Sequence, residues 1–219
     1  MYNLFPKWEV FFGVWYKLIY NKFISLAKIS LQKLVYLDGI LKIISNQKGK
    51  SMKELISKLE IQSRILELGQ EISKDHTNDS ILAIGILKGS FIFMADLVRE
   101  IKSDVEVEFL SASSYGSEKT SSGIVKLEML NRLNLKDKNI ILVEDIIDTG
   151  LTLNKIVDEV LKQSPRSLKV CSLLVKKDKH SFQHNIDYVG FNIEDRFVVG
   201  YGLDFNGRFR NLPYVAVLD

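Results

Sequence analysis

The side chains best suited to chemistry lie in the stretch IILVEDIIDTGLTL, residues 140–153. Its four opening apolar residues are typical of a strand with both faces buried in a parallel sheet. Two neighbouring carboxylates, Glu144 and Asp145, follow where that strand is expected to end, and a short polar turn then leads into a helix. Because open α/β sheets bind ligands beyond the carboxyl ends of their strands, we expect a binding site here.

The turn at residues 148–152 has the composition of a site for a phosphate group. Backbone N–H groups at the start of a helix attract anions, and the helix dipole adds to this attraction. Thr149 and Thr152 add hydroxyl donors, and Gly150 lets the backbone approach a ligand closely. The two acids would repel phosphate, so we expect them to bind sugar hydroxyls, a cation, or both. The stretch predicts a ligand with a phosphate at one end and a diol beside it.

A plain strand–turn–helix connection, with Asp148 or Thr149 as the helix N-cap, is the alternative to a ligand site. This alternative leaves the two adjacent acids at the strand end unexplained. A Walker A nucleotide loop is excluded as well, because the stretch has no Gly-Lys-Ser/Thr sequence.

Residues 143–150, together with Thr152, resemble the phosphoribosyl pyrophosphate signature of the type I phosphoribosyltransferases. The form with two isoleucines before Asp-Thr-Gly is similar to that of the hypoxanthine-guanine phosphoribosyltransferases. The resemblance extends over roughly residues 60–219. It implies that Asp148 is the catalytic base and that phosphoribosyl pyrophosphate is bound by Glu144, Asp145, Ile147, Asp148, Thr149, Gly150, Leu151 and Thr152.

Two further motifs resemble family segments that contact phosphoribosyl pyrophosphate. The turn at residues 87–90 is similar to one that contacts pyrophosphate through Lys88 and Gly89, which implies a cis peptide between these two residues. Ser114 and Tyr115 resemble the pair in the family's flexible lid, which keeps water away from a reactive sugar. Taken singly, the first motif is also compatible with an ordinary strand–helix turn and the second with a polar loop.

The residues expected to bind the purine follow later in the chain. The resemblance implies that the Lys176 ammonium contacts the oxygen at purine C6, which favours hypoxanthine and guanine over adenine. In the tail, which resembles the family's base-binding hood, Phe197 would stack on the base and Val198 would offer its backbone to the base edge. Asp204 would line the purine side, and Arg210 would bind pyrophosphate through its planar guanidinium. The alternatives are a solvated basic cluster at Lys176 and a core position for Phe197.

The resemblance also implies Mg²⁺ as a cofactor, held by protein carboxylates together with pyrophosphate oxygens. The expected metal ligands are Glu144, Asp145 and Asp204. The chain departs from the family at Leu151, where many relatives carry Lys or Arg; this removes a side chain but leaves the backbone cradle. Residues 193–195 lack a proline that is common in the hood.

Hydrophobic periodicity supplies the elements that would position these residues. Apolar residues at helical spacing predict helices over 52–73, 91–101 and 153–161. Apolar or alternating runs predict strands over 81–87, 105–110, 124–130, 139–143 and 168–175. Strands that alternate with helices predict an α/β fold with a mostly parallel sheet flanked by helices. The resemblance implies the type I phosphoribosyltransferase fold with a small base-binding hood.

Charge divides the chain into two parts. Residues 1–50 carry eight lysines and two acids, for a net charge of +6, whereas the remainder carries 22 basic and 25 acidic residues, for −3. We expect a phosphoribosyltransferase domain at 51–219 and a basic, apolar N-terminal extension of unknown role at 1–50. Two interpretations of the extension stay open: an amphipathic helix lying on a membrane, or upstream sequence before a true start at Met52.

The predicted activity is a purine salvage reaction. It transfers 5-phosphoribosyl from phosphoribosyl pyrophosphate to N9 of hypoxanthine or guanine and gives IMP or GMP and pyrophosphate. The family implies a homodimer or homotetramer, and the acidic body argues against a nucleic-acid partner. Two rivals stay open: a nucleic-acid-binding regulator with this fold that uses phosphoribosyl pyrophosphate as a signal, and an enzyme that prefers xanthine, since one hydrogen bond decides such a preference.

The remaining reactive side chains are expected to have no catalytic role. Cys171 is the one cysteine, so no internal disulfide can form, and its apolar surroundings predict a buried thiol in a reducing, cytoplasmic compartment. The three histidines are expected at the surface: His76, His180 and His184.

Overall fold

The computed structural model describes residues 52–111, 133–177 and 181–218. At its centre is a five-stranded sheet whose strands all run parallel, in the order β3-β2-β4-β5-β6. The strands are β2 (Ile81–Leu87), β3 (Val105–Ser111), β4 (Asn139–Ile147), β5 (Ser167–Lys176) and β6 (Tyr188–Ile193). The prediction of an α/β fold with a mostly parallel sheet is confirmed.

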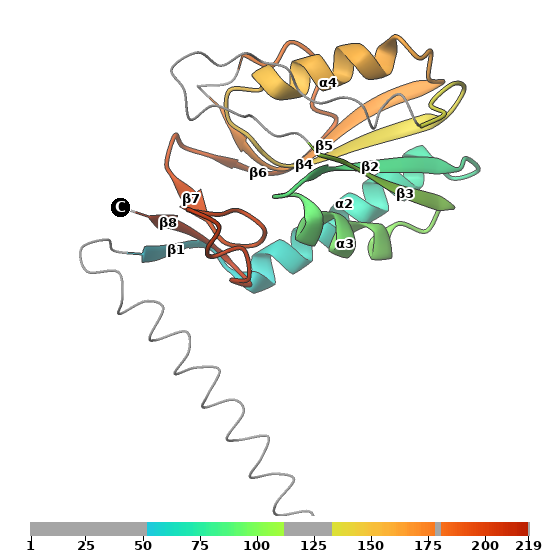
Figure 1. Cartoon of the computed structure of the whole chain (residues 1–219). Coiled ribbons are helices and arrows are strands. Elements are labelled where there is room, and N and C mark those ends of the chain that lie inside the picture. Colours follow the sequence, from blue (N-terminus) through green and yellow to red (C-terminus); the bar gives the residue numbers. More distant parts are fainter. Residues whose placement is uncertain (1–51, 112–132, 178–180, 219) are drawn as a thin grey trace, which may run out of the picture. The chain divides into compact units, whose positions relative to one another are not determined.

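Helices cover both faces of this sheet, with α2 and α3 on one face and α4 on the other (Figure 1). α2 spans Lys58–Asp75, α3 spans Phe91–Glu100 and α4 spans Leu151–Leu161. Side chains of a strand point alternately to the two faces. In β2, Ala83 therefore joins the core beneath α2 and α3, while its neighbour Ile84 joins the core beneath α4.

A second, antiparallel sheet has the order β1-β8-β7, and we call it the hood. Its strands are β1 (Met52–Ile56), β7 (Val198–Val199) and β8 (Val215–Leu218). β8 is the central strand, because its residues pair with both β1 and β7. The hood shares a core with α2 and α3 through buried side chains that include Ile56, Val198, Val215 and Val217.

Two of the predicted element boundaries differ from the structure by more than two residues. Residues 52–56, predicted to open a helix, form strand β1 because β8 offers them a backbone partner. The helix begins only after Ser57, whose side chain forms a capping box with Glu60. The strand predicted over 139–143 continues to Ile147, as β4. The strand predicted over 124–130 lies outside the described residues.

The predicted surface position of His76 is wrong as well. The residue is the C-cap of α2 and is only 4% exposed. The His76 carbonyl accepts hydrogen bonds from Asp79 N and Ser103 Oγ. His184 is partly exposed and contacts Asp158 at 3.1 Å, whereas His180 lies outside the described residues. The buried position predicted for the Cys171 thiol is confirmed.

The division of the chain at residue 50 stays a prediction, since residues 1–51 are not among the described ones. Within the described segments, no helix is both long enough and apolar enough to cross a membrane.

Candidate active site

The two adjacent acids lie at the carboxyl end of β4. β2 pairs with β4 only as far as Val143, whereas β5 pairs with it up to Ile147. Beyond Val143, the freed side of β4 borders a cavity of about 370 Å³. The cavity is lined by Ile86, Leu87, Lys88, Gly89, Glu144, Asp145, Thr152, Leu153, Ile156, Asp204 and Arg210. Seven of these were predicted as site residues from the sequence.

Burial makes both acids unusually weak. Glu144 Oε2 is buried and has no hydrogen-bond partner in the described part of the chain. This burial, and secondarily the charge of Asp145, raises the pKa of Glu144 well above its ordinary value. Burial also raises the pKa of Asp145 to about 6, although Ile146 N donates a hydrogen bond of 2.9 Å to Asp145 Oδ1. A cation or a hydroxyl donor beside these two buried carboxylates would stabilise their charged form.

The predicted phosphate turn connects β4 to α4. Gly150 is the N-cap of α4, with a φ of 73°, and no side chain caps the helix start. The alternative of Asp148 or Thr149 as the N-cap is therefore wrong. Positive φ suits glycine, and a Cβ at Gly150 would also come within 2.7 Å of Phe182 Cβ. Backbone conformation and packing therefore both require glycine at this position. The close approach of a ligand, predicted from the sequence, is a separate reason.

The segment after residue 180 supports this turn from outside. Ser181 N donates to the Thr149 carbonyl at 2.8 Å, and Asn154 Nδ2 donates to the Ser181 carbonyl at 3.0 Å. Phe182 packs on Gly150 and belongs to the core beneath α4. Sequence reasoning missed Ser181 and Phe182, because no local pattern links them to a turn about thirty residues earlier.

The turn at residues 88–90 is held between the acid pair and the tail. A Cβ at Gly89 would lie 1.4 Å from Asp145 Oδ2, and a Cβ at Gly202 would lie 2.1 Å from the Gly89 carbonyl oxygen. The backbones of Gly89 and Gly202 and the carboxylate of Asp145 thus meet in a space that admits no further side chain. The cis peptide joins Leu87 to Lys88, one bond earlier than expected.

Arg210 connects the tail to the same cavity. Its Nη1 donates to the Gly202 carbonyl at 2.5 Å, and its Nη2 lies 2.5 Å from Asp204 Oδ1. Gly207 N donates to Asp204 Oδ2 at 2.7 Å, so both carboxylate oxygens of Asp204 have partners. The planar guanidinium thereby fixes the loop between residues 202 and 210.

Lys176 is a buried cation at the end of β5. The residue is 6% exposed, and its Nζ lies 3.1 Å from Asp148 Oδ2 and 3.0 Å from Asp195 Oδ1. The alternative of a solvated basic cluster is therefore wrong for Lys176. Asp195 is a third residue that sequence reasoning missed, although it stands only two positions before Phe197.

The structure separates Phe197 from Val198 by exposure. Phe197 is 51% exposed and meets Phe205 edge-on, with ring centroids 5.7 Å apart, so it is not a core residue. Val198 is buried and pairs with Val217 in the hood. The Phe197 carbonyl accepts from Leu218 N at 3.0 Å, which ties this segment to β8. An exposed ring beside a fixed backbone can stack on a flat ligand.

The family model of the phosphoribosyl transferase domain matches residues 51–206. This chain belongs to the phosphoribosyltransferase family. It is 42% identical to the hypoxanthine-guanine phosphoribosyltransferase of Aquifex aeolicus over 173 residues, covering 78% of this chain and 97% of the relative. It is 42% identical to the hypoxanthine phosphoribosyltransferase of Escherichia coli K12 over 169 residues, covering 76% and 94%.

Solved structures agree with this assignment of the phosphoribosyltransferase. A hypoxanthine-guanine phosphoribosyltransferase from Bacillus anthracis matches with a TM-score of 0.68 and 41% identity, covering 78% of this chain and 100% of that chain. A hypoxanthine phosphoribosyltransferase from Trypanosoma cruzi, solved in a ternary substrates complex, matches with a TM-score of 0.68 and 36% identity, covering 76% and 95%. The predicted resemblance, fold and transferase class are confirmed.

The acids of this phosphoribosyltransferase fit Mg²⁺ only as an ion shared with a ligand. Among the described residues, no group of three or more His, Cys, Asp or Glu side chains could hold a metal ion by itself. Glu144, Asp145 and Asp204 nevertheless line one cavity, and Glu144 Oε2 lacks a partner there among those residues. Mg²⁺ commonly takes one or two carboxylates and completes its shell with phosphate oxygens and water.

The remaining predicted residues of the phosphoribosyltransferase lie partly within and partly outside the described segments. Lys88 and Leu151 are exposed, and Ile147 is buried in the core beneath α4. Ser114 and Tyr115 lie outside the described residues.

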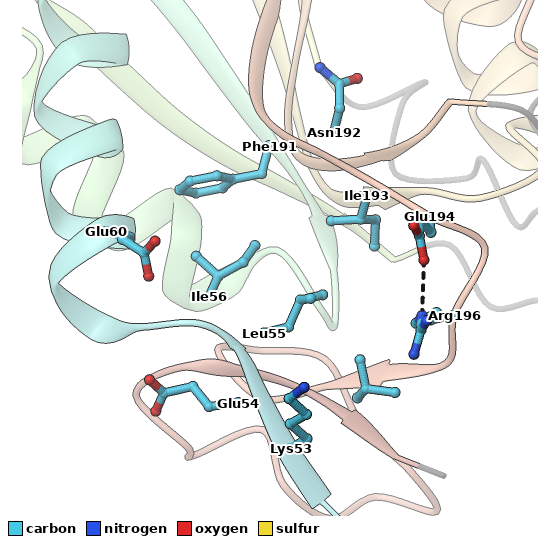
Figure 2. A pocket seen from close by; sticks show the side chains of 11 residues that line it. Lys53, Glu54, Leu55, Ile56, Glu60, Phe191, Asn192, Ile193, Glu194 and Arg196 are labelled. Carbon is cyan, nitrogen blue, oxygen red and sulfur yellow. Dashed lines mark hydrogen bonds and ion pairs between the residues drawn. The ribbon is translucent and has the colours of Figure 1, made fainter.

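A second cavity, of about 500 Å³, lies beside β1 and the end of β6 (Figure 2). It is lined by Lys53, Glu54, Leu55, Ile56, Glu60, Phe191, Asn192, Ile193, Glu194, Arg196 and Val217, and contains none of the predicted site residues.

Proposed function

We propose that the protein transfers 5-phosphoribosyl from phosphoribosyl pyrophosphate to N9 of a 6-oxopurine, hypoxanthine or guanine, and releases pyrophosphate. The observation that carries this proposal is the pair Lys176–Asp148, a buried ammonium 3.1 Å from a carboxylate at the edge of the phosphate turn. The similarity to relatives named hypoxanthine and hypoxanthine-guanine phosphoribosyltransferases supports the choice of base.

The turn and the acid pair suit one end of phosphoribosyl pyrophosphate. The uncapped start of α4 offers backbone N–H groups to the 5′-phosphate, and Thr149 and Thr152 add hydroxyls. Glu144 and Asp145 would bind the ribose hydroxyls on the adjoining side. Lys88, Gly89 and Arg210 would bind the pyrophosphate, with Ser114 and Tyr115 as the proposed lid.

Lys176, Phe197 and Val198 suit the purine. The buried Lys176 ammonium would donate a hydrogen bond to the oxygen at C6. Adenine carries an amino group at that position, which could not accept this hydrogen bond, so adenine would be rejected. The exposed Phe197 ring would stack on the base, and the Val198 backbone would meet its edge. Asp204 lines the cavity between this side and the acid pair.

In the proposed reaction, N9 of the base attacks C1′ of the ribose while the bond from C1′ to the pyrophosphate oxygen breaks. The leaving pyrophosphate keeps the electron pair, and the N7 proton passes to the Asp148 carboxylate, the general base. Lys88 and Arg210 offset charge that develops on pyrophosphate. Mg²⁺, held with Glu144, Asp145 and Asp204, would supply further positive charge when bound.

The test measures initial rates of pyrophosphate release with phosphoribosyl pyrophosphate, Mg²⁺ and each of hypoxanthine, guanine, xanthine and adenine. We expect turnover with the oxopurines but not with adenine, and a rate about tenfold or more lower for Asp148→Asn. Asp158→Asn is a matched control, since this acid lies on α4 and contacts His184 outside the cavity. No turnover with any base, despite binding of phosphoribosyl pyrophosphate, would overturn the enzyme proposal and favour the regulator.

A cytoplasmic location and a homodimer or homotetramer remain part of the proposal. Gel filtration with light scattering would measure the oligomeric state.

A further inference from the structure

Asp195 reaches the active site from the loop between β6 and the hood. β5 and β6 end at the same level, because Lys176 pairs with Ile193 in the parallel ladder. Arg196 N donates to the Glu194 carbonyl at 2.8 Å, so Asp195 is the central residue of a three-residue turn. The Glu194 and Arg196 side chains pair with each other at 3.1 Å on the outer side of this turn (Figure 2). Asp195 instead contacts Lys176.

We propose that Asp195 is a positioning residue for base recognition, which holds the Lys176 ammonium between two carboxylates and directs its remaining N–H to the purine. This inference rests on the proposed function. An ammonium has three N–H donors; this one donates to Asp195 Oδ1 at 3.0 Å and forms an ion pair with Asp148 Oδ2 at 3.1 Å. Among the described residues these two carboxylates are its partners, which leaves a donor for an acceptor on the ligand.

The two carboxylates are not equivalent in this arrangement. Asp148 is the proposed base, so its negative charge disappears when it takes the N7 proton. Asp195 keeps its charge throughout and continues to hold Lys176 while the base reacts. Without Asp195, Asp148 would be the remaining carboxylate partner of the Lys176 ammonium among these three residues. The distance between the two charges would then shorten. Lys176 would then move away from the base oxygen, and Asp148 would be a poorer proton acceptor.

The experiment compares wild type with Asp195→Asn, which keeps the side-chain shape and removes the charge. We expect KM for hypoxanthine to rise about tenfold, as for loss of one charge-assisted hydrogen bond, with a smaller fall in kcat. KM for phosphoribosyl pyrophosphate should change less than about twofold, because its proposed contacts are untouched. Asp195→Glu should restore part of the loss, since it returns a carboxylate to the same turn.

Glu194→Gln is the matched control. It removes one negative charge from the neighbouring residue, whose side chain is 81% exposed and pairs with Arg196, and we expect wild-type constants. The decisive comparison repeats Asp195→Asn in the Lys176→Gln background. If Asp195 acts through Lys176, its substitution should have almost no further effect on KM for hypoxanthine.

Equal effects of Asp195→Asn in both backgrounds, or equal effects of Asp195→Asn and Glu194→Gln, would overturn the positioning role. A wild-type protein that turns over oxopurines while Asp195→Asn matches it in every constant would overturn this inference alone. A wild-type protein without turnover would overturn the proposed function, and the inference with it. Thermal unfolding of each variant shows whether a loss of activity is a loss of folded protein.

Discussion

The backbone of Gly89 lies directly against the carboxylate of Asp145, so that a methyl group at Gly89 would stand 1.4 Å from Asp145 Oδ2. This contact joins the turn after β2 to the acid pair at the end of β4. Gly202 packs on the Gly89 carbonyl, so the same turn contacts both the acid pair and the tail.

Gly89→Ala is therefore expected to displace the Asp145 carboxylate. Overpacking of this kind costs about 1–3 kcal/mol of unfolding free energy, and we expect kcat/KM for phosphoribosyl pyrophosphate to fall about a hundredfold. Chemical denaturation and steady-state rates measure the two effects. Adding Gly89→Ala to an Asp145→Ala protein should cost clearly less stability than adding it to wild type. Equal costs in the two backgrounds would contradict the clash.

The raised pKa values of the acid pair predict a pH-dependent response to Mg²⁺ and phosphoribosyl pyrophosphate. Asp145, with a pKa of about 6, must lose its proton to bind a cation, so binding should weaken as the pH falls through that value. In the ligand-free protein, the free energy of unfolding depends on pH in the opposite direction. Folding raises these pKa values, so stability declines as the pH rises from the ordinary carboxyl range towards the folded pKa values.

The measurement is the rise in Tm on adding Mg²⁺ and phosphoribosyl pyrophosphate at about pH 5.5 and about pH 7.5, with the larger rise expected at the higher pH. The ligand's own phosphate also loses a proton near pH 6. Asp145→Asn corrects for this, because the contributions of the ligand and of Glu144 remain in it while that of Asp145 is removed. A rise in Tm that depends on pH equally in both proteins would argue against the role of Asp145.

His76 is expected to make stability fall in mild acid. Burial lowers the pKa of His76 from its ordinary value near 6.5, and its ring nitrogens have no hydrogen-bond partner among the described residues. The unfolded chain then binds a proton that the folded chain resists. Stability should therefore decrease as the pH falls through about 6.5 towards the folded pKa.

His76→Phe removes the titrating group and keeps a ring in the space. We expect a smaller loss of unfolding free energy between about pH 7.5 and about pH 5.5 than in wild type, measured by urea denaturation. If wild type and His76→Phe lose the same unfolding free energy between these pH values, protonation of His76 does not cause the loss.

A cation placed at the start of α4 should strengthen binding of phosphoribosyl pyrophosphate. Leu151 is 59% exposed at the first position of the helix, beside the proposed 5′-phosphate site. Leu151→Lys should lower KM for phosphoribosyl pyrophosphate about two- to fivefold at low salt, with a smaller effect at high salt as charges are screened. Leu161→Lys, at the exposed last turn of the same helix, is the control and should leave KM unchanged. Equal effects of the two substitutions would point to overall charge.

The central part of the site could be predicted because it is continuous in the sequence. The end of β4, the turn and the start of α4 occupy residues 139–161, so strand pattern, paired acids and glycine turn all appear within one short stretch. Parallel strands bring the ends of β2 and β5 to the same edge, which is why Lys88 and Lys176 could be expected near it.

The parts that were missed depend on contacts between distant segments. β1 has its partner in β8, more than 150 residues away, and its apolar spacing alone suggested a helix. Asp195 acts on Lys176 through strand register, and Phe182 supports Gly150 through packing, neither of which leaves a local pattern. The burial of His76 at the C-cap of α2 depends on tertiary packing, which the polarity of the residue does not indicate.

The pairing of β1 with β8 has a consequence for the connectivity of the domain. Met52 lies opposite Leu218 in an antiparallel ladder, so the first and last described strands end side by side. A short turn from Leu218 to Met52 would convert them into an ordinary hairpin. The chain could then be opened elsewhere, for instance in the exposed turn near residue 164, to give a circular permutant with the same sheets. The contacts within residues 52–218 therefore do not require the chain to begin at β1 and end at β8.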